Sequence, residues 1–234
     1  MKRGFTLIEL LIVIAIIAIL ALIAIPNFLE SQVRAKVARA EADERSIGNA
    51  VEAYFVDYNR YPIGYTDVRE ANKDHPELMP VSKASERCLY SMSLLTTPIA
   101  YLSSVFPDPF NNARGYAVDR RNKPAPYYYE DFQSWNAYFS GRVVPPPGDP
   151  TLPFPYDYFQ KVHAAGYLWA VSSSSPIAKE TDVIRAIQGR SPWDTNEDPS
   201  KYTYYAYDPS NGTMSDGIIC RTNKGAFRGQ SPKL

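Results

Sequence analysis

The sequence predicts an α+β protein in which a long N-terminal helix, membrane-spanning over its first half, packs on a small antiparallel β-sheet with long loops. Three features indicate this class. An apolar run opens the chain, helical periodicity continues beyond that run, and the distal half alternates strand-like segments with proline-rich stretches.

The apolar run covers residues 5–25, where Glu9 is the one ionisable side chain. As a helix rising about 1.5 Å per residue, it spans roughly 31 Å, which matches the hydrocarbon core of a bilayer. Lys2 and Arg3 precede the run and should stay cytoplasmic, so the chain after Pro26 is expected to be extracytoplasmic. We therefore predict a retained, single-pass membrane helix.

The carboxylate of Glu9 needs a physical reason, because placing it in a membrane helix costs about 2.5–3.5 kcal/mol. If the chain is cut after the small residue Gly4, Phe5 carries a new ammonium four residues away. The ammonium of one subunit can then pair with the carboxylate of the next, which makes Glu9 an assembly device. The alternative is a protonated or snorkelling carboxylate in a plain membrane anchor.

The stretch KRGFTLIEL, which begins at Lys2, resembles the prepilin leader and cleavage site of type IV pilins and type II secretion pseudopilins. The resemblance implies cleavage between Gly4 and Phe5 by the prepilin peptidase, N-methylation of Phe5, and a role in assembly for Glu9. Pro26 lies where this family has its helix-bending proline. The phrases YFVDYNRYP and LLTTPIAYLSSVFPDPF further resemble the major, G-type pseudopilin.

This resemblance also divides the chain. It implies a leader (1–4), a transmembrane half of the stem (5–25), an extracytoplasmic half of the stem (26–61) and a globular pilin-like head (62–234). Two loop insertions are expected in the head, at 63–87 and 122–165, because both segments are irregular and contain prolines.

The extracytoplasmic stem is expected to present one apolar face, interrupted by Glu44. This face comprises Val33, Val37, Ala40, Ile47, Val51, Tyr54 and Tyr58. The opposite face carries charges of both signs and is predicted to be solvated, or to set subunit register in a filament. These charges are Arg34, Lys36, Arg39, Glu41, Asp43, Arg45 and Glu52. The stem should end at Asn59-Arg60-Tyr61-Pro62, since the residue before a proline leaves helical geometry.

Four segments of the head have the aromatic and β-branched composition of strands: 115–118, 166–172, 202–207 and 217–221. No cofactor is expected except calcium, which many major pseudopilins hold in loops near the end of the sheet. Oxygen ligands suit this ion, and four residues offer them here: Asp208, Asn211, Ser215 and Asp216. The segment Ser173-Ser174-Ser175-Pro176 lacks the carboxylate that the family leads us to expect. The alternative is that the four residues only form turns.

The two cysteines, Cys88 and Cys220, would lie in an extracytoplasmic compartment that permits disulfides. A bond between them would close a loop of about 130 residues and add roughly 4–5 kcal/mol of stability. Both the bonded and the unbonded state stay open. Neither cysteine lies in a C-x-x-C motif, which argues against zinc and redox chemistry.

Composition and motifs argue against several other functions. Basic and acidic residues balance at 25 each, which gives no support for nucleic-acid binding. The chain has two histidines and no H-E-x-x-H, G-x-S-x-G or phosphate-binding glycine loop, so we do not expect an enzyme. A binding module remains as an alternative, because aromatic residues around Tyr127-Tyr128-Tyr129 and Trp135 could form a platform for a glycan.

The sequence thus predicts a structural subunit of a type IV pilin-like filament, with the pseudopilus of a type II protein secretion system as the preferred assembly. A major or minor type IV pilin in adhesion or motility, and a membrane-anchored glycan-binding surface protein, are the alternatives. The expected partners are other copies of the chain, the prepilin peptidase and methyltransferase, the inner-membrane assembly platform and minor pseudopilins. We expect an inner-membrane protein whose filament lies in the periplasm or at the cell surface.

Overall fold

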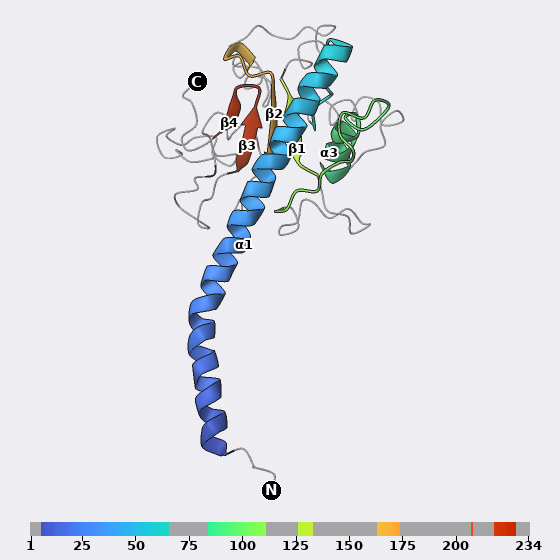
Figure 1. Cartoon of the computed structure of the whole chain (residues 1–234). Coiled ribbons are helices and arrows are strands. Elements are labelled where there is room, and N and C mark those ends of the chain that lie inside the picture. Colours follow the sequence, from blue (N-terminus) through green and yellow to red (C-terminus); the bar gives the residue numbers. More distant parts are fainter. Residues whose placement is uncertain are drawn as a thin grey trace.

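The structure is a computed structural model of the chain, and it describes residues 6–65, 84–110, 126–132, 163–173, 207 and 218–227. The helices named in these parts are α1 (Leu7–Tyr58) and α3 (Ala84–Ser93). The strands are β1 (Tyr128–Asp131), β2 (Trp169–Ser173), β3 (Ile219–Thr222) and β4 (Gly225–Phe227). Helix α1 is a long stem whose upper half lies against the head (Figure 1).

Both ends of α1 follow from local sequence. Thr6 is the N-cap and forms a capping box with Glu9, which satisfies the backbone N–H groups of Thr6 and Glu9 at the start of the helix. At the other end Asn59 takes the left-handed conformation, with φ 51° and ψ 28°, which asparagine tolerates better than most residues. The Asn59 N–H donates to the Phe55 carbonyl at 2.8 Å. The stem helix therefore stops where the sequence predicts.

The described strands form one antiparallel sheet in the order β1-β2-β3-β4. Tyr129 pairs with Val171 across β1 and β2, and Val171 pairs with Arg221 across β2 and β3. Because side chains alternate between the two faces of a strand, Tyr129, Val171 and Arg221 share a face, which is the face that packs on α1. The expected α+β architecture is confirmed.

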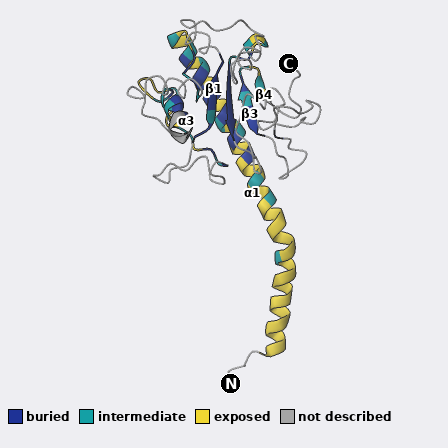
Figure 2. Ribbon diagram, turned by 180° about the vertical axis from the view of Figure 1, so that it is seen from behind, coloured by how far each residue is buried: buried dark blue, intermediate teal, exposed yellow. Residues whose placement is uncertain are grey.

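The core of the head lies between this face of the sheet and one side of α1. The helix contributes Val37, Ala40, Ile47, Val51 and Tyr54, all buried, and Val33 and Tyr58 pack at the margins. This is the apolar face that the spacing in the sequence predicts. Figure 2 shows the burial ending abruptly below the head, where the stem becomes exposed on all sides.

Two predicted loops contain regular structure, which corrects the sequence analysis. Strand β1 lies inside 122–165, and Ala84 to Arg87 of the predicted loop 63–87 belong to α3. β1 is the edge strand of the described sheet, the position where flanking prolines do least harm because an edge needs fewer paired amides.

The other predicted strands have mixed outcomes. Residues 166–172 and 217–221 overlap β2 and β3, and β4 was not predicted. Residues 115–118 and 202–206 lie outside the described residues.

Candidate functional site

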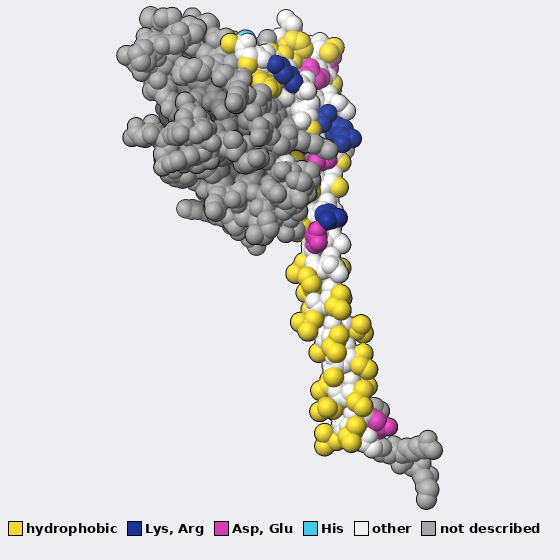
Figure 3. Space-filling model, turned by 90° about the vertical axis from the view of Figure 1, so that its left-hand side faces the viewer, with side chains coloured by type: hydrophobic (Ala, Val, Ile, Leu, Met, Phe, Trp, Pro, Cys, Tyr) yellow, Lys and Arg dark blue, Asp and Glu magenta, His cyan; other side chains and the backbone are white. Residues whose placement is uncertain are grey.

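The lower stem is exposed around its whole circumference. Large apolar side chains from Leu7 to Leu29 are 45–81% exposed, and Figure 3 shows them covering the stem below the head. An ordinary amphipathic helix would expose only its polar side to water. A helix that is apolar all round requires an apolar environment, either lipid or other helices like itself. Among the described residues, α1 is the helix long and apolar enough to span a membrane.

Near the lower end of α1, Thr6 and Glu9 form a closed polar unit. The Thr6 N–H donates to Glu9 Oε2 at 2.8 Å and the Thr6 hydroxyl donates to the same oxygen at 2.7 Å. The Glu9 N–H in turn donates to Thr6 Oγ1 at 3.3 Å. The hydrogen bonds from Thr6 thus all use Oε2, and they hold the carboxylate beside the N-terminus of the helix.

Thr6 is a residue whose role the sequence analysis missed, although the signal was present. The pattern T-x-x-E directly before an apolar run is the signature of a capping box. Glu9 therefore has a partner within its own subunit as well as the cation predicted from a neighbouring one.

Pro26 lies within α1, which extends on both sides of it. Its ring removes one backbone donor from the helix. A soft point at Pro26, predicted from the sequence, stays a prediction. Gly4 and Phe5, the predicted cleavage site, lie outside the described residues.

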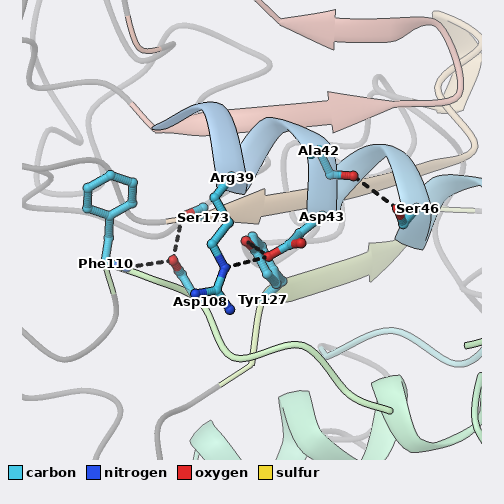
Figure 4. Close-up of polar contacts among 8 residues, drawn as sticks. All are labelled: Arg39, Ala42, Asp43, Ser46, Asp108, Phe110, Tyr127 and Ser173. Atoms are coloured by element: carbon cyan, nitrogen blue, oxygen red, sulfur yellow. Dashed lines mark hydrogen bonds and ion pairs between the residues drawn. The ribbon is translucent and has the colours of Figure 1, made fainter. Parts of the chain in front are cut away.

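The upper stem carries acidic side chains that hold the head. Glu52 accepts a hydrogen bond from the indole N–H of Trp169 at 2.6 Å and another from the Tyr61 hydroxyl at 3.3 Å. Asp43 accepts from the Tyr127 hydroxyl at 2.9 Å and pairs with Arg39 at 3.5 Å, as Figure 4 shows. Of the two roles predicted for this charged face, full solvation is wrong for Asp43 and Glu52, and a part in subunit register stays a prediction.

Close packing reinforces these hydrogen bonds. A Cβ atom added to Gly48 would lie 2.7 Å from the ring of Trp169, so glycine lets the indole sit directly on the helix backbone. Burial of Tyr61, together with the adjacent Glu52 carboxylate, raises the pKa of the Tyr61 hydroxyl to about 12. Tyr61 therefore stays a hydrogen-bond donor throughout the neutral range.

The disulfide between Cys88 and Cys220, which the sequence left open, does not form in this structure. Cys88 lies on α3, which packs against β1, whereas Cys220 lies on β3, and both thiols are buried. β2 separates β1 from β3, and strands are spaced about 4.8 Å apart. Cys88 and Cys220 therefore belong to different elements, α3 and β3, and no bond joins them here.

The predicted oxygen ligands for calcium, Asp208, Asn211, Ser215 and Asp216, lie outside the described residues, so calcium binding stays a prediction. Only some residues of the predicted aromatic platform lie in the described part of the chain. Tyr127 and Tyr129 are buried in the core, which removes them from any binding surface, and Trp135 lies outside the described residues.

Comparisons with known proteins support the features found in the stem. The family model described as the prokaryotic N-terminal methylation motif matches residues 1–25. The chain is 36% identical to the type IV major pilin protein PilA of Myxococcus xanthus (strain DK1622) over 50% of this chain and 54% of that protein.

The type II secretion system core protein G of two bacteria is also similar. The protein from Pectobacterium carotovorum subsp. carotovorum is 39% identical over 26% of this chain and 39% of its own length. The protein from Escherichia coli (strain K12) is 38% identical over 35% of this chain and 55% of its own length. The chain thus spans about half or less of the length of these relatives. No solved structure matches.

Proposed function

Because the chain is type IV pilin-like in its N-terminal motif and in its fold, we propose that it is a structural subunit of a helical filament. The observation that carries the proposal is the methylation motif joined to a stem that is apolar on every side. Such a stem is stable in a bilayer as a single subunit and stable in a bundle of stems as a filament. The same surface therefore serves both as an anchor and as an assembly interface.

In this proposal the chain is cut after Gly4 and methylated on Phe5. The new ammonium lies one residue before the N-cap Thr6. In a filament the ammonium of one subunit meets Glu9 of its neighbour, where the hydrogen bonds from Thr6 go to Oε2 and leave Oε1 for the incoming cation. Pairing neutralises both charges inside the apolar bundle, and an unpaired charge there would cost several kcal/mol.

The preferred assembly is the pseudopilus of a type II secretion system. Core protein G sequences from several bacteria resemble this chain, and the head keeps the segment that leads from a helix to an Asp-Pro turn. The longer match to a type IV major pilin supports the alternative, a pilus for adhesion or motility. Deleting the gene separates the two. Loss of secreted proteins with surface pili unchanged supports the pseudopilus, and the reverse supports the pilus.

The partners and location follow from this role. The partners would be other copies of the chain, the prepilin peptidase and methyltransferase, the inner-membrane assembly platform and minor pseudopilins. Before assembly the subunit would lie in the inner membrane with its head outside the cytoplasm. No enzymatic activity is proposed for it.

The decisive experiment is the intact mass and N-terminal sequence of the protein from its native membrane, combined with a filament assay of Glu9→Val. We expect a product that begins at methylated Phe5, and filaments from the wild type but not from the variant. Glu30→Gln, which removes a carboxylate of the same stem above the apolar run, is the matched control and should assemble. An uncut chain, or assembly that is indifferent to Glu9, would instead indicate a plain membrane-anchored surface protein.

A further inference from the structure

Glu44 is a carboxylic acid inside the apolar contact between stem and head. Its side chain is 1% exposed, and it lies on the face of α1 that also buries Ala40 and Ile47. The Glu44 Oε1 atom is fully buried without a hydrogen-bond partner among the described residues. A carboxylate in such a place is costly, because a buried charge that lacks partners forfeits its hydration. A protonated acid avoids most of this cost.

A second buried acid lies beside it. Asp108 is 2% exposed, and its Oδ1 accepts hydrogen bonds from the Ser173 hydroxyl at 2.6 Å and from the Phe110 N–H at 2.9 Å (Figure 4). The backbone N–H of the same Ser173 donates to Glu44. Ser173 at the end of β2 therefore ties an acid of the stem to an acid of the loop that precedes β1.

The charges around Glu44 and Asp108 favour a state in which one of the two acids is protonated over a state in which both are ionised. Asp108 and Glu41 face Glu44 with like charge, and Arg221 on β3 is the one cation that acts on it among the described residues. The other titratable neighbours, Tyr127 and the Cys220 thiol, are neutral at ordinary pH. Burial, followed by repulsion from Asp108 and Glu41, raises the pKa of Glu44 well above its usual range, and the Ser173 N–H and Arg221 oppose this effect.

We propose that Glu44 is the proton-binding group of a latch between stem and head. While Glu44 carries a proton, the head stays tightly docked on α1. When the proton is lost, a buried negative charge that Arg221 and the Ser173 N–H offset only in part appears between α1 and the end of β2, and docking weakens. The head of each subunit would thus respond to the pH of the compartment that it occupies.

The direction of the pH dependence follows from linkage. In the unfolded chain Glu44 titrates near its ordinary pKa, and in the folded chain it titrates higher. Below the unfolded pKa the group is protonated in both states and its contribution to stability is fully present. As the pH rises toward the folded pKa, that contribution is lost. The folding equilibrium constant then falls by up to about tenfold for each pH unit.

The test uses the full chain in detergent micelles. Thermal unfolding is followed from about pH 5 to pH 9 for the wild type, for Glu44→Gln and for the control Glu30→Gln. Glutamine keeps the shape of the side chain and the carbonyl that accepts from Ser173, but it cannot ionise. We expect the wild type to lose stability relative to Glu44→Gln as the pH rises, whereas Glu30→Gln follows the wild type.

Two further measurements keep the proposal falsifiable if Glu44→Gln folds poorly. Infrared difference spectra of the wild type should show the carbonyl band of a protonated carboxylic acid at neutral pH. Asp108→Asn, which removes one like charge and keeps an acceptor for Ser173, should shift the loss of that band to lower pH. Parallel pH curves for the wild type and Glu44→Gln, or an infrared spectrum without the band, would overturn the latch.

Discussion

The two halves of α1 share one continuous helix yet meet opposite environments. In the lower half, side chains from Leu7 to Leu29 are exposed on every side, and the closed unit of Thr6 and Glu9 is its polar feature. In the upper half, one face is buried under the sheet, and carboxylates at Asp43, Glu44 and Glu52 point into the head.

This difference separates two kinds of stability. Among the described residues, the lower half is exposed and adds nothing to the core of the head, so its substitutions should change insertion and assembly but not the unfolding of the head. The upper half carries the core, so its substitutions should change unfolding first and assembly only as a consequence.

The largest effect is expected from a charge in the middle of the lower half. Ile16→Lys places an ammonium where a bilayer or a bundle of stems requires an apolar surface, at a cost of about 2.5–3.5 kcal/mol. We expect a loss of about a hundredfold in filament incorporation, measured by shearing filaments from cells and blotting for the subunit. Ser46→Lys adds the same charge to an exposed position of the upper half and should assemble normally. An equal loss of filament incorporation in both variants would show that the two halves of α1 do not differ in their role in assembly.

The next effect should come from the packing of Trp169 on the upper half. In Gly48→Val the new side chain meets the indole, which cannot retreat because its N–H is bound to Glu52 at 2.6 Å. Overpacking of this kind costs about 1–3 kcal/mol, seen as a lower midpoint of thermal unfolding. Asn49→Val introduces the same β-branched residue at an exposed neighbouring position and serves as the control. Equal destabilisation in both would assign the effect to helix propensity instead of packing.

The stem was predictable because its signals are local. The apolar run, the threes-and-fours spacing and the Asn59 stop all act within one or two turns of helix. The capping box at Thr6 was equally local and could have been recognised from T-x-x-E. These elements follow from the sequence without knowledge of the rest of the chain.

The contacts between the stem and the head were not predictable, because the residues that form them are distant in sequence. Asp43 binds Tyr127 and Glu52 binds Trp169, which lie 84 and 117 residues further along the chain. Both acids lie at the margin of the apolar stripe, where periodicity cannot separate a solvated side chain from one that reaches into a core. Strand β1 was missed because its four residues, YYED, include two acids and lie among prolines, although its tyrosines favour a strand.

A smaller effect is expected when one hydrogen bond between the stem and the head is removed. Tyr127→Phe deletes the hydroxyl that donates to Asp43 at 2.9 Å and leaves the buried ring in place. A hydrogen bond to a charged group contributes about 1.5 kcal/mol at the low end of its range, and Asp43 keeps its contact with Arg39. Thermal unfolding should show this loss. Tyr101→Phe, which removes a hydroxyl bound to Asp57 at an exposed site, should change stability less. If Tyr101→Phe instead destabilises the protein more than Tyr127→Phe, the docking of the head depends on the end of α1 more than on its middle.

The smallest effect marks the boundary between the halves. Arg34 pairs with Glu30 at 2.6 Å on adjacent turns, with side chains that are 72% and 43% exposed. Exposed pairs with this spacing contribute about 0.3–0.5 kcal/mol and are screened by salt. Arg34→Ala should therefore shift unfolding slightly at low ionic strength and not at all in about 1 M salt. Lys36→Ala removes a neighbouring exposed cation as a control. If Arg34→Ala instead abolishes filaments while the head unfolds as in the wild type, Arg34 contacts another subunit, and the assembly surface extends from the lower half past Pro26 toward the head.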